Sequence, residues 1–225
     1  MEKAFLCDSS SIITLVDSCF GGLFAFLSKK YGVDFYITPD VKKEIVDRPL
    51  SMEMKAYRMS ALRIKRMLDN EVLKEIDADT EDMTEELMDL ANNIFSIKGR
   101  KIHLIDPGET DLISVANTLR IDRLLIDERT TRLLIEAPFT IQKHFEEELG
   151  VDVDFDKKVY RTFEQHVRGL SVFRSTELLA VAYKAGYFEK FGDASHDAFV
   201  AALYKAKYSG CAVRFDEIEE MARFL

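Results

Sequence analysis

Cysteine and histidine are scarce in this chain. Its three cysteines, Cys7, Cys19 and Cys211, form no Cys-x-x-Cys pair and leave an odd number. That usage fits a reducing compartment better than a disulfide scaffold, and it excludes a cysteine-rich zinc site. The four histidines are scattered along the chain. A metal site in this protein is therefore expected to use oxygen ligands.

Excess positive charge and long apolar runs are also missing. The formal net charge of −9 argues against a protein that coats nucleic acid by bulk electrostatics, but it permits a local basic groove. The longest apolar patch, 19–27, is interrupted by Gly21 and Gly22 and is too short to span a membrane. The first residues show no secretory leader pattern. We therefore expect a soluble, cytoplasmic protein without a membrane partner.

Short apolar segments alternate with helical periodicity along the 225 residues, of which 47% are hydrophobic. The segments that read as buried strands are 4–7, 35–37, 124–126 and 170–173. The segments with helical spacing include 52–68, 83–95, the helix beginning near Pro107, and 175–183. This alternation predicts an α/β fold with a parallel sheet, whose site lies at the carboxyl ends of the strands.

Three regions are distinguished by their patterns. Residues 1–191 are expected to form the main domain. Within it, 138–168 lacks a regular pattern and is interpreted as an insertion. Residues 192–225 have helical spacing and are expected to form a C-terminal extension.

Acidic residues flank the apolar middle of segment 106–131. Asp127 directly follows a predicted strand, and Glu109 and Asp111 lie at the start of the predicted helix. Glu109 also has a structural explanation, because Asp106 and Glu109 have capping-box spacing with Pro107 at the first helical position. The capping box does not account for Asp111.

Two further acids occupy similar places. Asp8 ends the first predicted strand and precedes three serines, so it is either a site residue or the N-cap of a helix. Glu44 lies about a turn and a half into a helix that Thr38 and Pro39 are expected to begin. Its alternative role is that of a solvated residue paired with a lysine.

Four carboxylates on one rim would repel each other unless cations lay between them. Mg²⁺ or Mn²⁺ are the expected ions, since both prefer oxygen ligands. Such ions activate water and stabilise charge on a phosphate, which makes phosphodiester hydrolysis the leading reaction class. A basic cluster on helix 52–68 is either a solvated face or a contact for a phosphate backbone. Its members are Lys55, Arg58, Arg63, Lys65 and Arg66.

Together these motifs resemble the PIN-domain family, which includes single-strand RNA endonucleases and the toxins of prokaryotic toxin–antitoxin pairs. The segments that carry the resemblance are Leu6-Cys7-Asp8-Ser9-Ser10 with Ile12; Ile37-Thr38-Pro39 leading to Glu44-Ile45; Pro107-Gly108-Glu109 with Ala116; Leu125-Ile126-Asp127-Glu128-Arg129; and Gly169-Leu170-Ser171-Val172 followed by Leu178-Leu179 and Lys184-Ala185-Gly186. The order and spacing of these segments, which span most of 4–187, make the match specific. The insertion and the tail exceed a minimal domain of this family, and they are expected to bind a partner, form an oligomer contact or cover the cleft.

The resemblance implies a three-layer α/β/α sandwich with a central first strand. It also implies metal coordination by Asp8, as the main bridging ligand, and by Asp127 and Glu44. Glu109 is the preferred fourth ligand, and Asp111 serves in its place or beside it.

The resemblance assigns supporting places to Ser10, near the metal, and to Glu128, as a paired acid. The implied activity is a metal-dependent endoribonuclease acting on single-stranded or structured RNA, with an antitoxin-like protein or a second copy as further partners. The alternative is a catalytically idle PIN-like module that acts through protein or RNA contacts.

Overall fold

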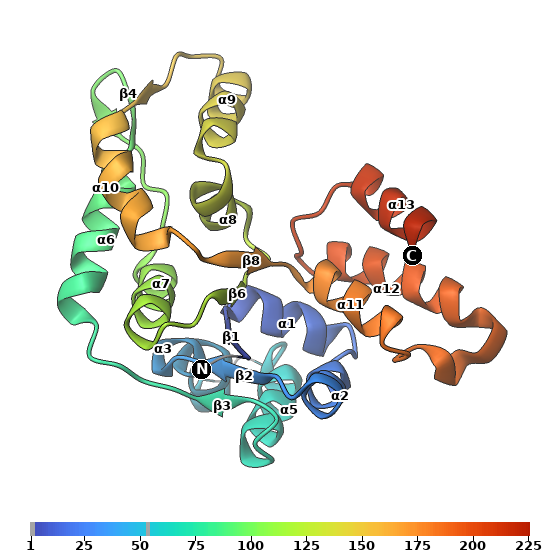
Figure 1. The fold of residues 1–225 in the computed structure, drawn as a ribbon. Helices are drawn as coiled ribbons and strands as arrows, with labels where there is room; N and C mark the ends of the chain where they lie inside the picture. The colour runs from blue at the N-terminus through green and yellow to red at the C-terminus, as the bar shows by residue number, and fades with distance from the viewer. Residues whose placement is uncertain (1–2, 53–54) are drawn as a thin grey trace.

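A parallel sheet of five short strands forms the centre of the computed structural model, which describes residues 3–52 and 55–225 (Figure 1). Its strand order is β3-β2-β1-β6-β8. The strands are β1 (Ala4–Cys7), β2 (Asp34–Ile37), β3 (Lys74–Glu75), β6 (Arg123–Leu125) and β8 (Ser171–Phe173). Leu6 pairs with Tyr36 on one side and with Leu124 on the other. The predicted α/β class, parallel sheet and central first strand are therefore confirmed.

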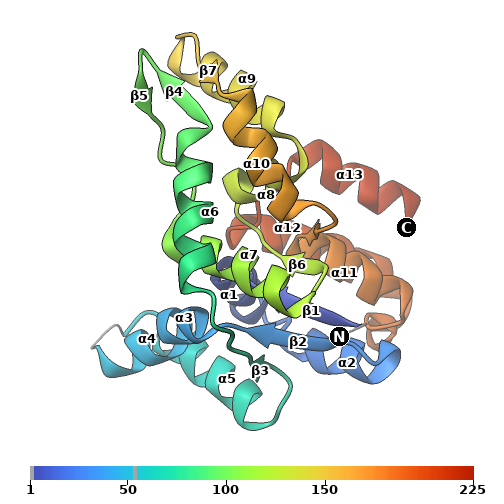
Figure 2. The same cartoon turned by 60° about the vertical axis from the view of Figure 1, so that its left-hand side comes forward.

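Helices cover both faces of the sheet. Helices α1 (Ser9–Asp17), α2 (Gly22–Tyr31) and α11 (Ser175–Lys184) lie on one side (Figure 1). Helix α7 (Pro107–Leu119), with α6 (Glu81–Asn93) and α10 (Lys157–Val167) beside it, lies on the other (Figure 2). This double cover explains why all of β1 is buried and apolar, with the Phe5 ring between those of Phe35 and Phe173. The arrangement is compatible with three layers.

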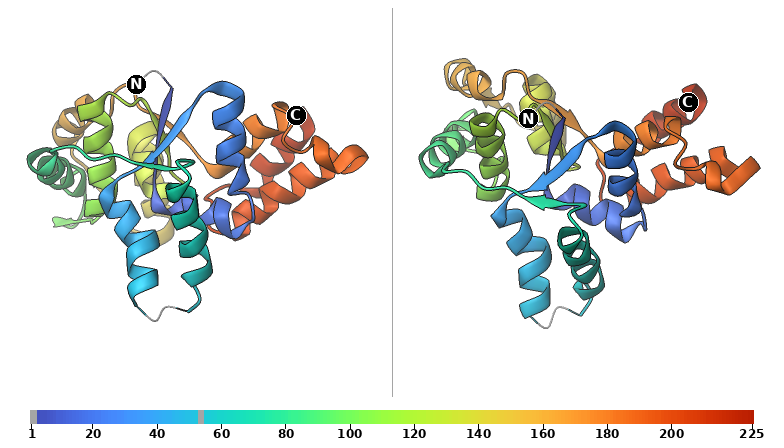
Figure 3. Two further views of the ribbon diagram at one scale, coloured as in Figure 1. Left: turned by 90° about the horizontal axis from the view of Figure 1, so that it is seen from below. Right: turned by 60° about the horizontal axis from the view of Figure 1, so that its bottom comes forward.

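A helical hairpin projects from the sheet beyond β2 (Figure 3). One arm consists of α3 (Pro39–Lys42), the π-helical turn η1 (Lys43–Asp47) and α4 (Arg48–Ser51), and the other arm is α5 (Arg58–Asp69). Thr38 caps α3 with Pro39 in the first position, as the sequence predicts. The helix predicted for 52–68 begins at Arg58, and the 53–54 part of that prediction, including Met54, lies outside the described residues.

Segment 138–168 differs from its irregular sequence pattern. It contains α9 (Pro138–Leu149), β7 (Asp154–Phe155) and α10, and it follows α8 (Arg129–Glu136). Strand β7 pairs with β4 (Phe95–Ile97), which also pairs with β5 (Arg100–Lys101), in a small antiparallel sheet at the top of Figure 2. The local pattern does not reveal these elements, because their apolar partners, such as Phe95 for Phe155, are distant in sequence.

The tail beyond β8 and α11 is helical. It contains the 3₁₀ turn η2 (Glu189–Ala194), α12 (Ser195–Tyr208) and α13 (Phe215–Phe224). Helix α12 lies beside α11, and α13 lies beside α12 (Figure 1). In residues 3–52 and 55–225, no single helix is long and apolar enough to cross a membrane. In the same described ranges, α1 and α2 taken together, with a bend of 107° between them, meet the length and composition of a span.

Candidate active site

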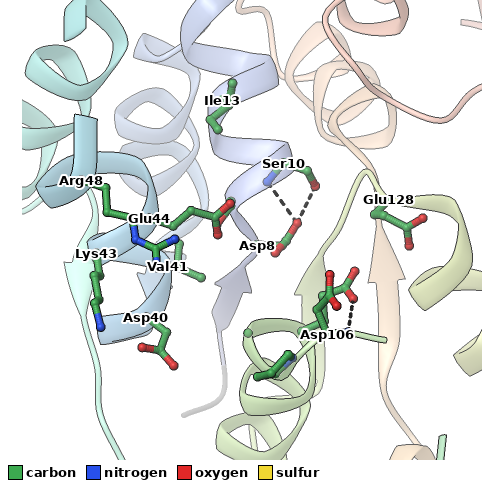
Figure 4. Close-up of a pocket in the computed structure, with 14 residues that line it drawn as sticks. Asp8, Ser10, Ile13, Asp40, Val41, Lys43, Glu44, Arg48, Asp106 and Glu128 are labelled. Atoms are coloured by element: carbon green, nitrogen blue, oxygen red, sulfur yellow. Dashed lines mark hydrogen bonds between the residues drawn. The ribbon is translucent and has the colours of Figure 1, made fainter. Parts of the chain in front are cut away.

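An acidic cleft of about 510 Å³ opens at the carboxyl end of β1. Its walls come from the start of α1, from the α3–η1 arm, from the start of α7 and from the loop after β6 (Figure 4). The acids that line it are Asp8, Asp40, Glu44, Asp106, Glu109 and Glu128. Figure 4 shows Asp8 between Glu44 on one side and Glu128 on the other.

Three consecutive serines fix the innermost wall of the acidic cleft. The backbone N–H and the hydroxyl of Ser10 donate to Asp8 Oδ2 at 3.0 and 2.5 Å, so Asp8 is indeed the N-cap of α1. The Ser9 hydroxyl donates to Glu44 Oε2 at 2.6 Å. The Ser11 hydroxyl bonds the carbonyls of Asp8 and Leu125, both at 2.9 Å, and joins α1 to β6. Capping and site placement therefore coexist at Asp8.

Glu44 reaches the acidic cleft from a π-helical turn. Pro49 has no N–H to donate to Ile45, so the regular α-helical ladder cannot continue through this turn. The Arg48 N–H instead bonds the Lys43 carbonyl, five residues earlier. This wider turn brings Lys43, Glu44 and Arg48 to the wall of one cleft.

Thr131 holds the two acids on the opposite wall. Its hydroxyl donates to Glu109 Oε1 and its backbone N–H donates to Glu128 Oε2, both at 2.6 Å. The Asp106 N–H donates to Glu109 Oε2 at 2.9 Å, which completes the capping box predicted from the sequence. Thr131 itself is fully buried. Thr131 was not among the predicted site residues, because a threonine in the first turn of a helix gives no local signal of a site.

Two acids of the cleft, Asp8 and Glu109, have raised pKa values. Burial raises the pKa of Glu109 to about 7, and repulsion by Glu128 and Asp8 adds to this increase. Burial also raises the pKa of Asp8, against the hydrogen bonds from Ser10 and with a further contribution from Glu44. The side chains of Glu44, Asp8, Glu109 and Glu128 therefore form a chain of repelling carboxylates.

Asp127 does not reach the acidic cleft. Its carboxylate is fully buried and accepts hydrogen bonds from the Ser175 N–H and hydroxyl, both at 2.7 Å. Its backbone carbonyl accepts from the Ala212 N–H at 3.1 Å. Its placement thus differs from the expectation of a ligand on the common rim. The neighbouring Glu128 lines the cleft in its stead.

Asp111 also faces elsewhere. Its carboxylate accepts from the Thr80 hydroxyl at 3.0 Å and lines a separate hollow between α6 and α7. Each position along an α-helix turns the side chain by about 100°, so two positions turn it by about 200°. Residues 109 and 111 therefore point to opposite sides of α7. The segment before α7, 102–105, has no regular secondary structure, and the Asn92 side chain holds it by accepting from the N–H groups of Leu104 and Ile105.

The predicted basic cluster does not face the acidic cleft. Its members line other hollows or the outer surface of α5 and its approach, and none of Lys55, Arg58, Arg63, Lys65 and Arg66 lines the cleft. The cations on the cleft wall are instead Lys43 and Arg48, neither of which belongs to the predicted basic cluster. Within residues 3–52 and 55–225, neither forms an ion pair with a carboxylate.

The donor chemistry of the cleft suits Mg²⁺ or Mn²⁺, because every candidate ligand is a carboxylate oxygen. As the side chains are placed, however, no three acidic, histidine or cysteine groups in the described part of the chain stand close enough together to hold an ion. The cleft therefore offers the right atoms without a closed coordination shell. Comparison with protein-family profiles, curated proteins and solved structures found no match to this chain.

Proposed function

We propose that this protein is a divalent-metal-dependent endoribonuclease of the PIN type, acting at the acidic cleft. The observation that carries the proposal is the chain of repelling carboxylates at the carboxyl end of β1, with raised pKa values at Asp8 and Glu109. A cation among them would relieve the repulsion. Such an ion, when bound, supplies an activated water and neutralises charge on a phosphate.

Four residues would hold the ion. Asp8 is central because it is coupled electrostatically to both Glu44 and Glu109. Glu44 and Glu109 stand on opposite walls, and Glu128 accompanies Glu109 through the shared partner Thr131. Gathering these acids around one ion requires side-chain rotations. Hydrogen bonds from Ser9, Ser10 and Thr131 now occupy one oxygen each of Glu44, Asp8 and Glu128. Both oxygens of Glu109 are occupied, by Thr131 and by the Asp106 N–H.

The test is cleavage of a mixed-sequence single-stranded RNA with Mn²⁺, with Mg²⁺ and with EDTA, using the parent protein, Asp8→Asn and Asp111→Asn. Asparagine is a good N-cap, so Asp8→Asn keeps the fold. We expect it to lose at least roughly 100-fold in rate, because even groups that only orient metal ligands contribute 10- to 100-fold. Asp111→Asn is the matched control and should cut as the parent does. Equal cutting by Asp8→Asn would overturn the proposed site.

One observation favours a second function, that of a catalytically idle PIN-like binding module. The acids are already engaged by neighbouring N–H and hydroxyl groups, and no three of them in the described residues are gathered around one point. Absence of cutting in every metal, with the protein folded, would support this function. Mn²⁺ titration by calorimetry then separates an idle metal site from no metal site.

A further inference from the structure

A second, largely apolar hollow of about 420 Å³ adjoins the acidic cleft on the helical hairpin. Ile45 and Ile64, which are almost fully buried, contribute to its lining. Pro49, Met52 and Tyr57 line it as well, with Met52 57% and Tyr57 52% exposed. We call this site the apolar hollow. Tyr57 thus combines a half-exposed aromatic ring with a place in the wall of the hollow, where the ring can be reached by a flat ligand.

The apolar hollow and the acidic cleft are neighbours that share part of their lining. Ile13, Glu44 and Arg48 line both of them. One part of a ligand can therefore occupy the hollow while the adjoining part lies in the cleft. Arg48 stands at the boundary, and in the described ranges its guanidinium pairs with no carboxylate. A guanidinium in this position suits a ligand whose apolar group lies in the hollow and whose phosphate lies at the edge of the cleft.

We infer that the apolar hollow binds one nucleobase of single-stranded RNA, stacked on Tyr57, while Arg48 contacts the phosphate next to that base. This inference rests on the proposed function and names how the same site selects its substrate. A nucleotide matches the two hollows because its base is flat and largely apolar and lies beside a phosphate. A base paired in a duplex could not enter the hollow, so the substrate is unpaired at this position.

The charge of the protein supports a base contact. The net charge of −9 and the acidic cleft repel the RNA backbone, and the basic residues of α5 line other surfaces. Backbone attraction, which dominates ordinary nucleic-acid binding, is therefore weak here. Stacking on an aromatic ring supplies affinity without depending on net charge, and it tolerates different bases.

The test compares binding of two fluorescent probes, a six-nucleotide single-stranded RNA and a six-unit ribose-phosphate chain without bases, by fluorescence anisotropy. The protein carries Asp8→Asn to prevent cutting, with Tyr57→Ala, Tyr57→Phe or Tyr31→Ala added. We expect Tyr57→Ala to weaken RNA binding about 5- to 150-fold and to leave the base-free probe unchanged. Tyr57→Phe keeps the ring and should bind as the parent. Tyr31 is an exposed tyrosine on α2 that lines neither hollow, and it is the matched control.

A second measurement separates this inference from the proposed function. It is cleavage of the single-stranded RNA with Mn²⁺ by the parent protein and by the chain that carries only Tyr57→Ala. Metal-dependent cutting with RNA binding that ignores Tyr57 would overturn the inference and leave the nuclease intact. Tyr57-dependent binding without cutting by the parent would support the inference and overturn the nuclease. If Tyr57→Ala weakened binding of both probes equally, the inference of a base-binding hollow would be overturned, because the lost affinity would not depend on a base. Thermal melts of all variants show that they fold.

Discussion

At the scale of single residues, Glu109 in the acidic cleft makes the free energy of unfolding depend on pH. Burial raises the pKa of Glu109 from its ordinary 4.5 to about 7. Between these values the folded protein holds a proton that the unfolded chain has released, so the free energy of unfolding falls as pH rises through this window. We predict that Glu109→Gln is more stable than the parent at pH 8, by on the order of 2 kcal/mol. Urea unfolding at pH 5 and pH 8 measures the difference.

Glutamine can still serve at this position of a capping box, so the cap of α7 survives the change. The gain should shrink at pH 5, where the parent carboxyl is largely protonated. Glu147→Gln is the control, because that side chain lies on the surface beside Lys143 and its change should be worth less than about 1 kcal/mol at either pH. A Glu109→Gln effect that is the same at both pH values would contradict the raised pKa.

At the scale of elements, the π-helical turn decides which side chains face the cleft. In a regular α-helix, five positions turn the chain by about 140°. Residues 43 and 48 of such a helix would therefore point in different directions. In η1 the Arg48 N–H donates to the Lys43 carbonyl, five residues earlier, and both side chains line the cleft. We predict that Pro49→Ala restores the donor to Ile45, makes the arm regular and turns Glu44 away from Asp8. Mn²⁺ affinity measured by calorimetry should then fall by roughly tenfold, as for other changes that misorient a metal ligand.

Pro39→Ala is the control for this prediction. Pro39 occupies the first position of α3, where its missing N–H has no helical partner. Its replacement should leave Mn²⁺ affinity within about twofold. If the two variants bind Mn²⁺ alike, the π-helical turn does not position Glu44.

At the scale of the whole molecule, Arg174 ties the helical tail to the domain that carries the site. It is 8% exposed, donates to the Ala212 carbonyl at 3.1 Å and to Glu217 Oε2 at 2.8 Å, and also pairs with Glu177. Removing Arg174 would leave the negative charges of Glu177 and Glu217 without their partner. We predict that Arg174→Met lowers the free energy of unfolding by about 3 kcal/mol and exposes α13 to limited proteolysis.

Arg214→Gln is the control, since Arg214 pairs with Asp216 on the exposed surface and its loss should cost less than about 1 kcal/mol. Urea unfolding and the rate of tryptic cleavage within the tail measure both variants. Equal effects of the two changes would contradict the role of Arg174. The tail also contacts the residue that precedes Glu128, because the Ala212 N–H donates to the Asp127 carbonyl.

The sequence by itself determined the features that depend on neighbours within a few positions. Strand β1, the Thr38–Pro39 helix start and the Asp106–Glu109 capping box follow from short patterns, because caps and apolar runs are local interactions. The parallel sheet also followed, since short, fully apolar strands alternating with helices leave few other arrangements. The same local logic identified Asp8, Glu44 and Glu109, which line the cleft.

Only the tertiary structure decided which acids share a space. Asp127 and Glu128 are adjacent in sequence, yet Ser175, 48 residues away, binds the first and leaves the second to the cleft. Lys43 and Arg48 reach the cleft through a π-helical turn, and Thr131 joins Glu109 to Glu128 across α7 and α8. Side-chain direction at the end of a strand depends on partners from distant segments. The sequence pattern locates the rim, and long-range packing selects the side chains that point into it.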